Sequence, residues 1–284
     1  MLLTKASASR VLIVARYEIR RALAKKKVLA GVILVVSALI LGVYGFSEVM
    51  RISIVRNLPV RPDPGLAWIF TYFLPSYLLS GLAALIASGS FSEEFEKGTS
   101  ETLFTKPVTR LEIFLGKVLG GYILQAFFTL LLLVLSISST SIIFGSQQHL
   151  ELAPTILIAN IYSNTVFFSL ALALSALTRN TLIASSVSIV LLAFLPFVSG
   201  LLIFLERSVG GGYSIIARLL PTWGASMHAY IVPLNILERA LLFTPISASL
   251  YGDPLAACIS VAGYSLLFIS LAAYRILYSD IPRK

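Results

Sequence analysis

Long apolar runs dominate this chain, and its polar residues gather in the segments between them. A helix needs about 20 mostly apolar residues to cross a hydrocarbon core of about 30 Å, because lipid offers no partner to exposed backbone N–H and C=O groups. Six runs are long enough, at residues 28–46, 66–90, 113–144, 154–177, 181–205 and 255–277. The pattern predicts an all-α polytopic membrane protein with six transmembrane helices.

Two other membrane architectures conflict with this pattern. The strands of a β-barrel would show alternating polar and apolar residues over segments of about 10 residues, whereas these runs are continuously apolar. The first run is also too long and too far inside the chain for a cleaved signal peptide. We therefore expect all six helices in the mature protein.

The composition supports a membrane protein, because 57% of the residues are hydrophobic, 12% are charged and the mean hydropathy is +0.91. The net charge of +9 comes from basic residues that flank the apolar runs, so it favours membrane orientation over nucleic-acid binding. Cys258 is the single cysteine; it lies within the last run and is expected to serve packing.

The distribution of Lys and Arg predicts the orientation. If the N-terminus is inside, the inner segments hold 16 of the 22 basic residues and the outer segments hold 6. Positive charge marks the cytoplasmic face. We expect a multi-pass protein of the plasma membrane with both termini in the cytoplasm.

Two segments outside the spans have distinct patterns. Residues 7–27 place Leu12, Ala15, Ile19 and Leu23 about one turn apart among basic residues, which is typical of an amphipathic helix in contact with lipid headgroups, although a simple orientation anchor has the same pattern. This divides the chain into an N-terminal segment, 1–27, and a membrane domain, 28–284. The outer segment, 206–254, contains two short apolar pieces that suit either re-entrant helices or an external lid.

The segment at 92–112 is polar and rich in cap signals. Gly98 can end a helix in the left-handed conformation, and Thr99 can cap the next helix, a single turn over residues 100–104. Thr109 and Glu112 form the spacing of a capping box at the start of the third span. We predict a compact turn of helix between two caps; the alternative is an ordinary ordered loop.

Several kinds of chemistry lack their residues. The spans carry no ionisable side chain near their centres, which disfavours an ion-coupled carrier. The chain has no G-x-x-x-x-G-K-[ST] motif for nucleotide phosphates and no H-E-x-x-H motif or Cys and His cluster for a metal. Its histidines, His149 and His228, stand alone in outer segments. We expect no catalytic or metal site in this chain.

The chain resembles the permease subunits of type-2 ATP-binding-cassette transporters of the exporter class. The resemblance rests on the polar segment around Glu94 to Arg110, on RYEIRRALAKKK around Glu18, and on SALTRNTLIASSVSIVLLAF after the fourth span. It implies that the polar segment contains a coupling helix that docks onto a separate ATPase, which would bind ATP and Mg. It also implies an elbow helix at residues 7–27, outer re-entrant helices, and a second permease copy or paralogue that completes the path.

The resemblance assigns two groups of residues. Those expected to couple to the ATPase are Glu94, Gly98, Thr99, Glu101, Leu103, Phe104, Pro107 and Arg110. Those expected on the elbow helix are Arg16, Glu18, Arg20 and Arg21. As a physical extension, we predict that Glu93, Glu94 and Glu96 approach Arg16, Arg20 or Arg21. The alternative function is a non-transporting membrane protein, such as an immunity or sensory subunit.

Overall fold

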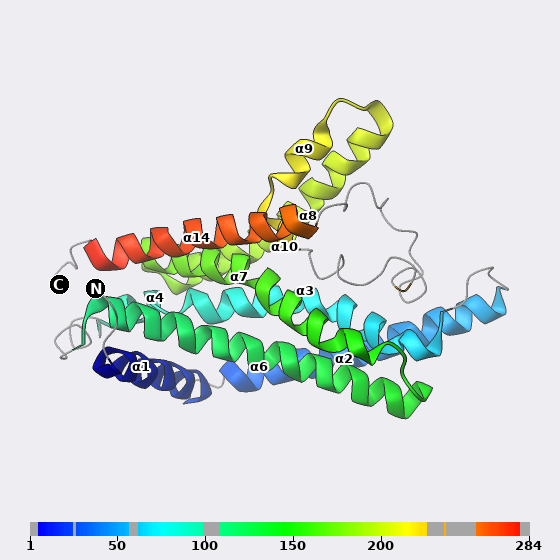
Figure 1. Cartoon of the computed structure of the whole chain (residues 1–284), viewed down its shortest axis with the longest axis horizontal. Helices are drawn as coiled ribbons and strands as arrows, with labels where there is room; N and C mark the ends of the chain where they lie inside the picture. Colours follow the sequence, from blue (N-terminus) through cyan, green and yellow to red (C-terminus); the bar gives the residue numbers. More distant parts are fainter. Residues whose placement is uncertain are drawn as a thin grey trace.

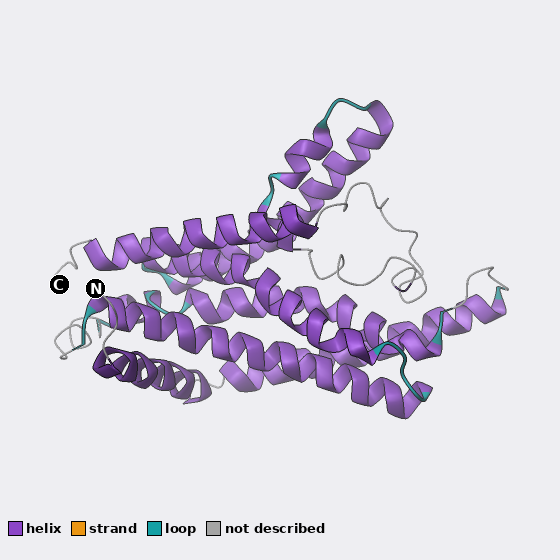
Figure 2. Cartoon of the chain, viewed as in Figure 1, coloured by secondary structure: helices purple, strands orange, loops and turns teal. Residues whose placement is uncertain are grey.

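The structure is a computed structural model that describes residues 5–24, 27–56, 62–98, 108–225, 236 and 254–278. All regular elements in these ranges are helices (Figure 2). Six are long and apolar enough to cross a membrane: α2 (Lys27–Val55), α3 (Ala67–Ser88), α6 (Arg110–Phe144), α7 (Ala153–Thr178), α8 (Thr181–Val209) and α14 (Pro254–Tyr278). The predicted all-α, six-span architecture is confirmed.

Shorter helices join or flank the six spans. They are α1 (Lys5–Ala24), α4 (Ser92–Glu96), α9 (Tyr213–Arg218) and α10 (Pro221–Ala225), with 3₁₀ turns η1 (Pro64–Leu66) and η2 (Leu150–Leu152). Figure 1 shows α1, α4 and the last turns of α14 at one end of an elongated bundle, and the α6–α7 connection at the other. We call these the α4 end and the η2 end.

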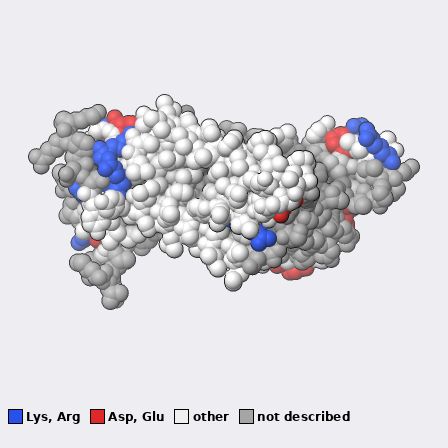
Figure 3. All heavy atoms as spheres, turned by 90° about the horizontal axis from the view of Figure 1, so that it is seen from above, with Lys and Arg blue, Asp and Glu red and all other residues white. Residues whose placement is uncertain are grey.

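Charged side chains are unevenly distributed along the molecule. In Figure 3 they lie at both ends of the visible face and in a small group between the ends, and a wide uncharged band separates the left-hand end from the others. The third span, α6, has 35 residues, which at about 1.5 Å per residue makes it longer than a hydrocarbon core of about 30 Å. Helix α6 is therefore longer than a single crossing of the hydrocarbon core requires.

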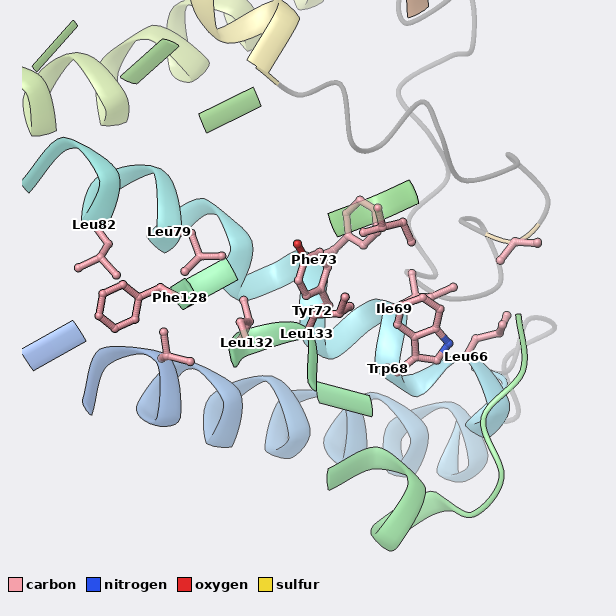
Figure 4. Close-up of a cluster of buried hydrophobic side chains, with 13 residues drawn as sticks. Leu66, Trp68, Ile69, Tyr72, Phe73, Leu79, Leu82, Phe128, Leu132 and Leu133 are labelled. Carbon is pink, nitrogen blue, oxygen red and sulfur yellow. The ribbon is translucent and has the colours of Figure 1, made fainter. Parts of the chain in front are cut away.

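Helix α3 lies at the centre of the bundle and packs against α2, α6, α7 and α8. Trp68 and Tyr72 on α3 are fully buried in a cluster that also contains Phe128 and Leu132 of α6; in Figure 4 Phe128 lies near Leu79 and Leu82, and Trp68 lies at the other end of the cluster. The indole N–H of Trp68 donates to the backbone carbonyl of Gln148 at 2.8 Å, so the start of α3 is also fixed to the α6–α7 connection. These contacts make α3 the main structural support.

Small and polar residues allow α3 and α7 to approach closely. Ser80 donates to the Oδ1 atom of Asn164 at 2.5 Å, and the Nδ2 atom of Asn164 donates to Asn160 at 2.8 Å. All three side chains are buried. The Ser80–Asn164 bond joins the two helices, the Asn164–Asn160 bond lies within α7, and both satisfy polar groups that lipid cannot.

The first span is longer than predicted. Helix α2 continues past residue 46, where the sequence pattern placed its end, to Val55. Phe46 is fully buried between Phe70 and Phe144, and the next residues contain no Gly or Pro to stop the helix. Arg51 pairs with Glu48 at 2.7 Å, which supports this exposed extension.

Part of the outer segment is described. The first predicted short piece, residues 214–220, forms most of α9, which packs against α8. Helix α10 follows and packs against α14. Gly224 permits the close approach of α10, since a Cβ atom there would lie 2.9 Å from the carbonyl oxygen of Ala257. The second predicted piece, 234–243, lies outside the described residues except for Ile236.

Candidate functional site

The described half of the polar segment starts with a break in the second span. Helix α3 ends at Ser88, earlier than the predicted residue 90, and the one-turn helix α4 follows. The Oγ atom of Ser175 on α7 accepts the backbone N–H groups of Phe91 and Ser92 at 3.2 and 3.0 Å. These donors would otherwise lack partners at the start of α4, so α7 fixes the position of that helix.

Both predicted caps within the described residues are present. Gly98 follows α4 with a φ of +66°, a conformation that favours glycine, and its N–H donates to the carbonyl of Phe95 at 3.3 Å. The capping box that opens α6 is complete, because Thr109 Oγ1 accepts from the N–H of Glu112 and a Glu112 carboxylate oxygen accepts from the N–H of Thr109. The polar segment at 92–112 therefore contains a defined end of α4 and a defined start of α6.

Glu94 is the centre of a buried group of charges at the α4 end. One of its carboxylate oxygens accepts from Lys117 Nζ at 2.5 Å and from Arg21 Nη1 at 3.1 Å. Arg21 also donates to Glu18 at 2.5 Å, and Lys117 Nζ lies 3.5 Å from Glu18. The predicted contact between Glu94 and an arginine of the N-terminal helix is confirmed for Arg21. We refer to Glu18, Arg21, Glu94 and Lys117 as the charge cluster.

The charge cluster is neutral and largely excluded from solvent. Its two carboxylates balance one guanidinium and one ammonium group, and Lys117 is only 1% exposed. Backbone carbonyls satisfy further donors: Lys117 donates to Ser90 at 2.5 Å and Arg21 to Gly89 at 3.2 Å. Because a buried charge is costly when it loses its partner, the cluster strongly favours one arrangement of α1, α4 and α6.

Helix α1 is docked onto α6 and does not lie only against lipid headgroups. A Cβ atom on Gly116 would be 2.5 Å from Val14 Cβ, and one on Gly120 would be 2.9 Å from the carbonyl oxygen of Ala15. The G-x-x-x-G spacing thus lets the two backbones approach, as in membrane helix pairs. Lys117 lies between these glycines, so the same groove brings it to Glu18.

The remaining predicted residues are distributed differently. Arg16 and Arg20 are exposed on the opposite side of α1, and Arg110 donates to the carbonyl of Leu277 at the end of α14 at 3.3 Å. The predicted coupling residues Thr99, Glu101, Leu103, Phe104 and Pro107 lie outside the described residues.

Glu96 contacts the start of α8. Its Oε1 atom accepts the backbone N–H of Thr181 at 2.7 Å, and its Oε2 atom accepts the hydroxyl of Thr181 at 2.9 Å. For Glu96 the predicted approach to the N-terminal arginines is therefore replaced by a contact with the start of α8. Residues 96 and 181 are far apart in the sequence, and no local pattern indicates their contact.

The turn between α7 and α8 carries a second missed contact. The guanidinium of Arg179 lies 4.9 Å from the ring centre of Phe95, within the range of a cation–π interaction. Burial lowers the pKa of Arg179 from its ordinary value, and the nearby charge of Arg275 lowers the pKa further. The side chain still remains a cation, because arginine is not deprotonated in proteins.

In the described part of the chain, the candidate site consists of buried ion pairs and helix caps. No group of three or more His, Cys, Asp or Glu residues there could hold a metal ion. His149 pairs only with the neighbouring Glu151 at 3.0 Å on the surface, and His228 lies outside the described residues. The buried ion pairs and caps instead join several helices at one end of the bundle.

The sequence was compared with known families and proteins. No curated protein gives a significant match. The model of the ABC-2 family transporter proteins matches residues 12–275, which include most of α1, the first five spans, most of α14 and the charge cluster. The chain therefore belongs to the ABC-2 family of transporter proteins.

Proposed function

We propose that this chain works as an ATP-driven exporter, coupled to a separate cytoplasmic ATPase subunit that binds ATP and Mg. The family and the six apolar helices, which make it a multi-pass membrane permease of an ABC transporter, support the proposal. Two permease chains, identical or paralogous, enclose the path.

The charge cluster is the observation that supports this coupling best. The resemblance places the coupling helix around residues 94–110. Helix α4 and Gly98 precede the stretch 99–107, and the Thr109 cap of α6 follows it. Glu94 and Lys117 bind each other across the two flanking helices, and Arg21 adds α1. A displacement of the segment therefore acts on α1, α3 and α6 together.

The orientation follows from the same end of the bundle. Arg10, Arg16, Arg20, Lys97 and Arg110 belong to segments at the α4 end, and Lys and Arg mark the cytoplasmic face. This arrangement supports a cytoplasmic position for the coupling segment, residues 92–112, within reach of a soluble ATPase. Both termini are then cytoplasmic, and α9 and α10 lie toward the outer leaflet.

Co-purification tests the proposed partner. The paired substitutions Glu101→Arg and Leu103→Arg put two cations on the coupling segment, and we expect them to abolish recovery of the ATPase with the tagged permease. The matched control is Leu150→Arg with Glu151→Arg, which changes the same residue types at the exposed η2 end. Equal recovery of the ATPase from both variants would contradict the proposal, and so would a wild-type chain that recovers none.

A further inference from the structure

Helix α4 contacts different helices on its two sides. Glu94 faces the charge cluster of α1 and α6, whereas Glu96 faces the first residue of α8. Residues two apart on an α-helix point about 200° away from each other, which explains why neighbouring glutamates reach opposite sides. Figure 1 shows α4 at the end of the bundle where all these helices meet.

Glu96 accepts two hydrogen bonds at the start of α8, although this position is exposed. The N–H groups of the first turn of a helix lack internal partners and carry partial positive charge, so a carboxylate there is favourable. Glu96 supplies that carboxylate to Thr181, and the side chain of Asn180 caps the N–H of Ile183 at 3.0 Å. The start of α8 is thus held jointly by its own cap and by α4.

Further contacts make the connection rigid. Ser92 and Thr181 share a hydroxyl hydrogen bond of 2.8 Å, and Phe95 lies under the Arg179 guanidinium. The turn from α7 to α8 has only Arg179 and Asn180, and Arg179 takes a positive φ of 55° that few non-glycine residues adopt. These contacts connect α4 tightly to the start of α8, so a shift of α4 also moves α8.

Helix α8 is the span best able to respond. Only 6% of its most apolar window is buried within the chain, against 71% for the second span and 72% for the fourth. It also contains Pro196, which removes one backbone hydrogen bond and permits bending. Helix α8 leads directly to α9 and α10 in the outer segment.

We infer that Glu96 is a positioning residue that transmits displacement of the coupling segment to α8, separately from the route through Glu94 to α6. The inference rests on the proposed function, because it requires a nucleotide-driven displacement at the α4 end. It adds α8, and with it the outer helices α9 and α10, to the parts of the permease that the ATPase moves.

Site-directed spin labels can follow the two routes independently in the reconstituted permease–ATPase complex. In a Cys258→Ser background, one label is placed at the exposed Val190 of α8 and, in a second protein, at the exposed Val134 of α6. The change in spectrum on adding ATP, Mg and vanadate is measured for wild type, Glu96→Ala and Glu96→Gln.

We expect both labels to respond in the unsubstituted complex. Glu96→Ala should reduce the α8 response by about threefold or more and leave the α6 response intact. Glu96→Gln should restore the α8 response, since its amide oxygen can still accept the Thr181 N–H. Thr181→Val, which removes the hydroxyl donor but keeps the N–H, should give an intermediate loss and serves as the second variant if Glu96→Ala does not fold.

The two label positions distinguish a failure of the separate α8 route from a failure of the proposed function. An unchanged α8 response in Glu96→Ala, or an equal loss at both labels, would overturn the separate route while the proposed function stands. If neither label responds in the unsubstituted complex, the proposed function fails and the inference fails with it.

Discussion

Lys117 and Glu94 bind each other at 2.5 Å, although their residues are only 1% and 8% exposed. Lys117 belongs to the third span and Glu94 to the short helix after the second, so this pair joins the two ends of the coupling segment directly. With Arg21 and Glu18 it forms a neutral cluster that favours a single geometry. The proposed coupling of α1, α4 and α6 depends on that geometry.

Removal of Lys117 should destabilise the fold strongly. Lys117→Met keeps the volume but leaves two carboxylates facing one guanidinium, and breaking a buried pair in this way costs about 3–5 kcal/mol. Thermal unfolding in detergent measures the effect. Lys97→Met, at an exposed position beside α4, is the control and should change stability by less than about 0.5 kcal/mol.

A double substitution tests whether the charge of Glu94 causes that loss. Combining Lys117→Met with Glu94→Gln removes one charge of each sign, so the double variant should be more stable than Lys117→Met alone. The coupling energy should be about 1–3 kcal/mol, within the range of contacting residues. Strictly additive effects would show that the two side chains do not interact.

The docking of α1 should depend on Gly116. A Cβ atom at Gly116 meets Val14, whereas one at Gly263 on α14 meets nothing within 4 Å. Alanine improves helix propensity equally at both positions, by about 1 kcal/mol, so the difference between the variants reports the clash. We expect Gly116→Ala to lower the unfolding temperature and Gly263→Ala to maintain or raise it. A similar effect of both substitutions would argue against close packing of α1 on α6.

The α3–α7 contact should depend on Asn164. Asn164→Leu removes the acceptor of Ser80 and the donor to Asn160, and interhelical hydrogen bonds in membranes contribute about 0.6–2 kcal/mol. Ser138→Ala, which removes an exposed intrahelical bond to Val134, is the control. If the two variants unfold at the same temperature, the buried chain of hydrogen bonds does not stabilise the pairing.

The features predicted correctly from the sequence are those set by local patterns. Continuous apolar runs predicted the six spans, and short-range signals predicted the Thr109 capping box and the left-handed Gly98. The contact of the N-terminal arginines with Glu94 was predicted from charge and proximity to the membrane face, and the structure selects Arg21.

The features that were missed depend on tertiary packing. The continuation of α2 to Val55 depends on the burial of Phe46 against two other helices. The pairing of Lys117 was missed, although its place between Gly116 and Gly120 was a signal that another helix approaches there. The contact of Glu96 with Thr181 joins distant parts of the chain and had no signal in the sequence.

Photo-cross-linking tests whether the coupling segment contacts the ATPase. A photoreactive amino acid replaces Phe104 in one protein and Leu150, at the opposite end of the bundle, in another, and both are irradiated with the ATPase present in native membranes. We predict a covalent adduct with the ATPase from position 104 and none from position 150. The absence of an adduct at 104, or equal adducts at both positions, would contradict the account that the ATPase acts through this segment.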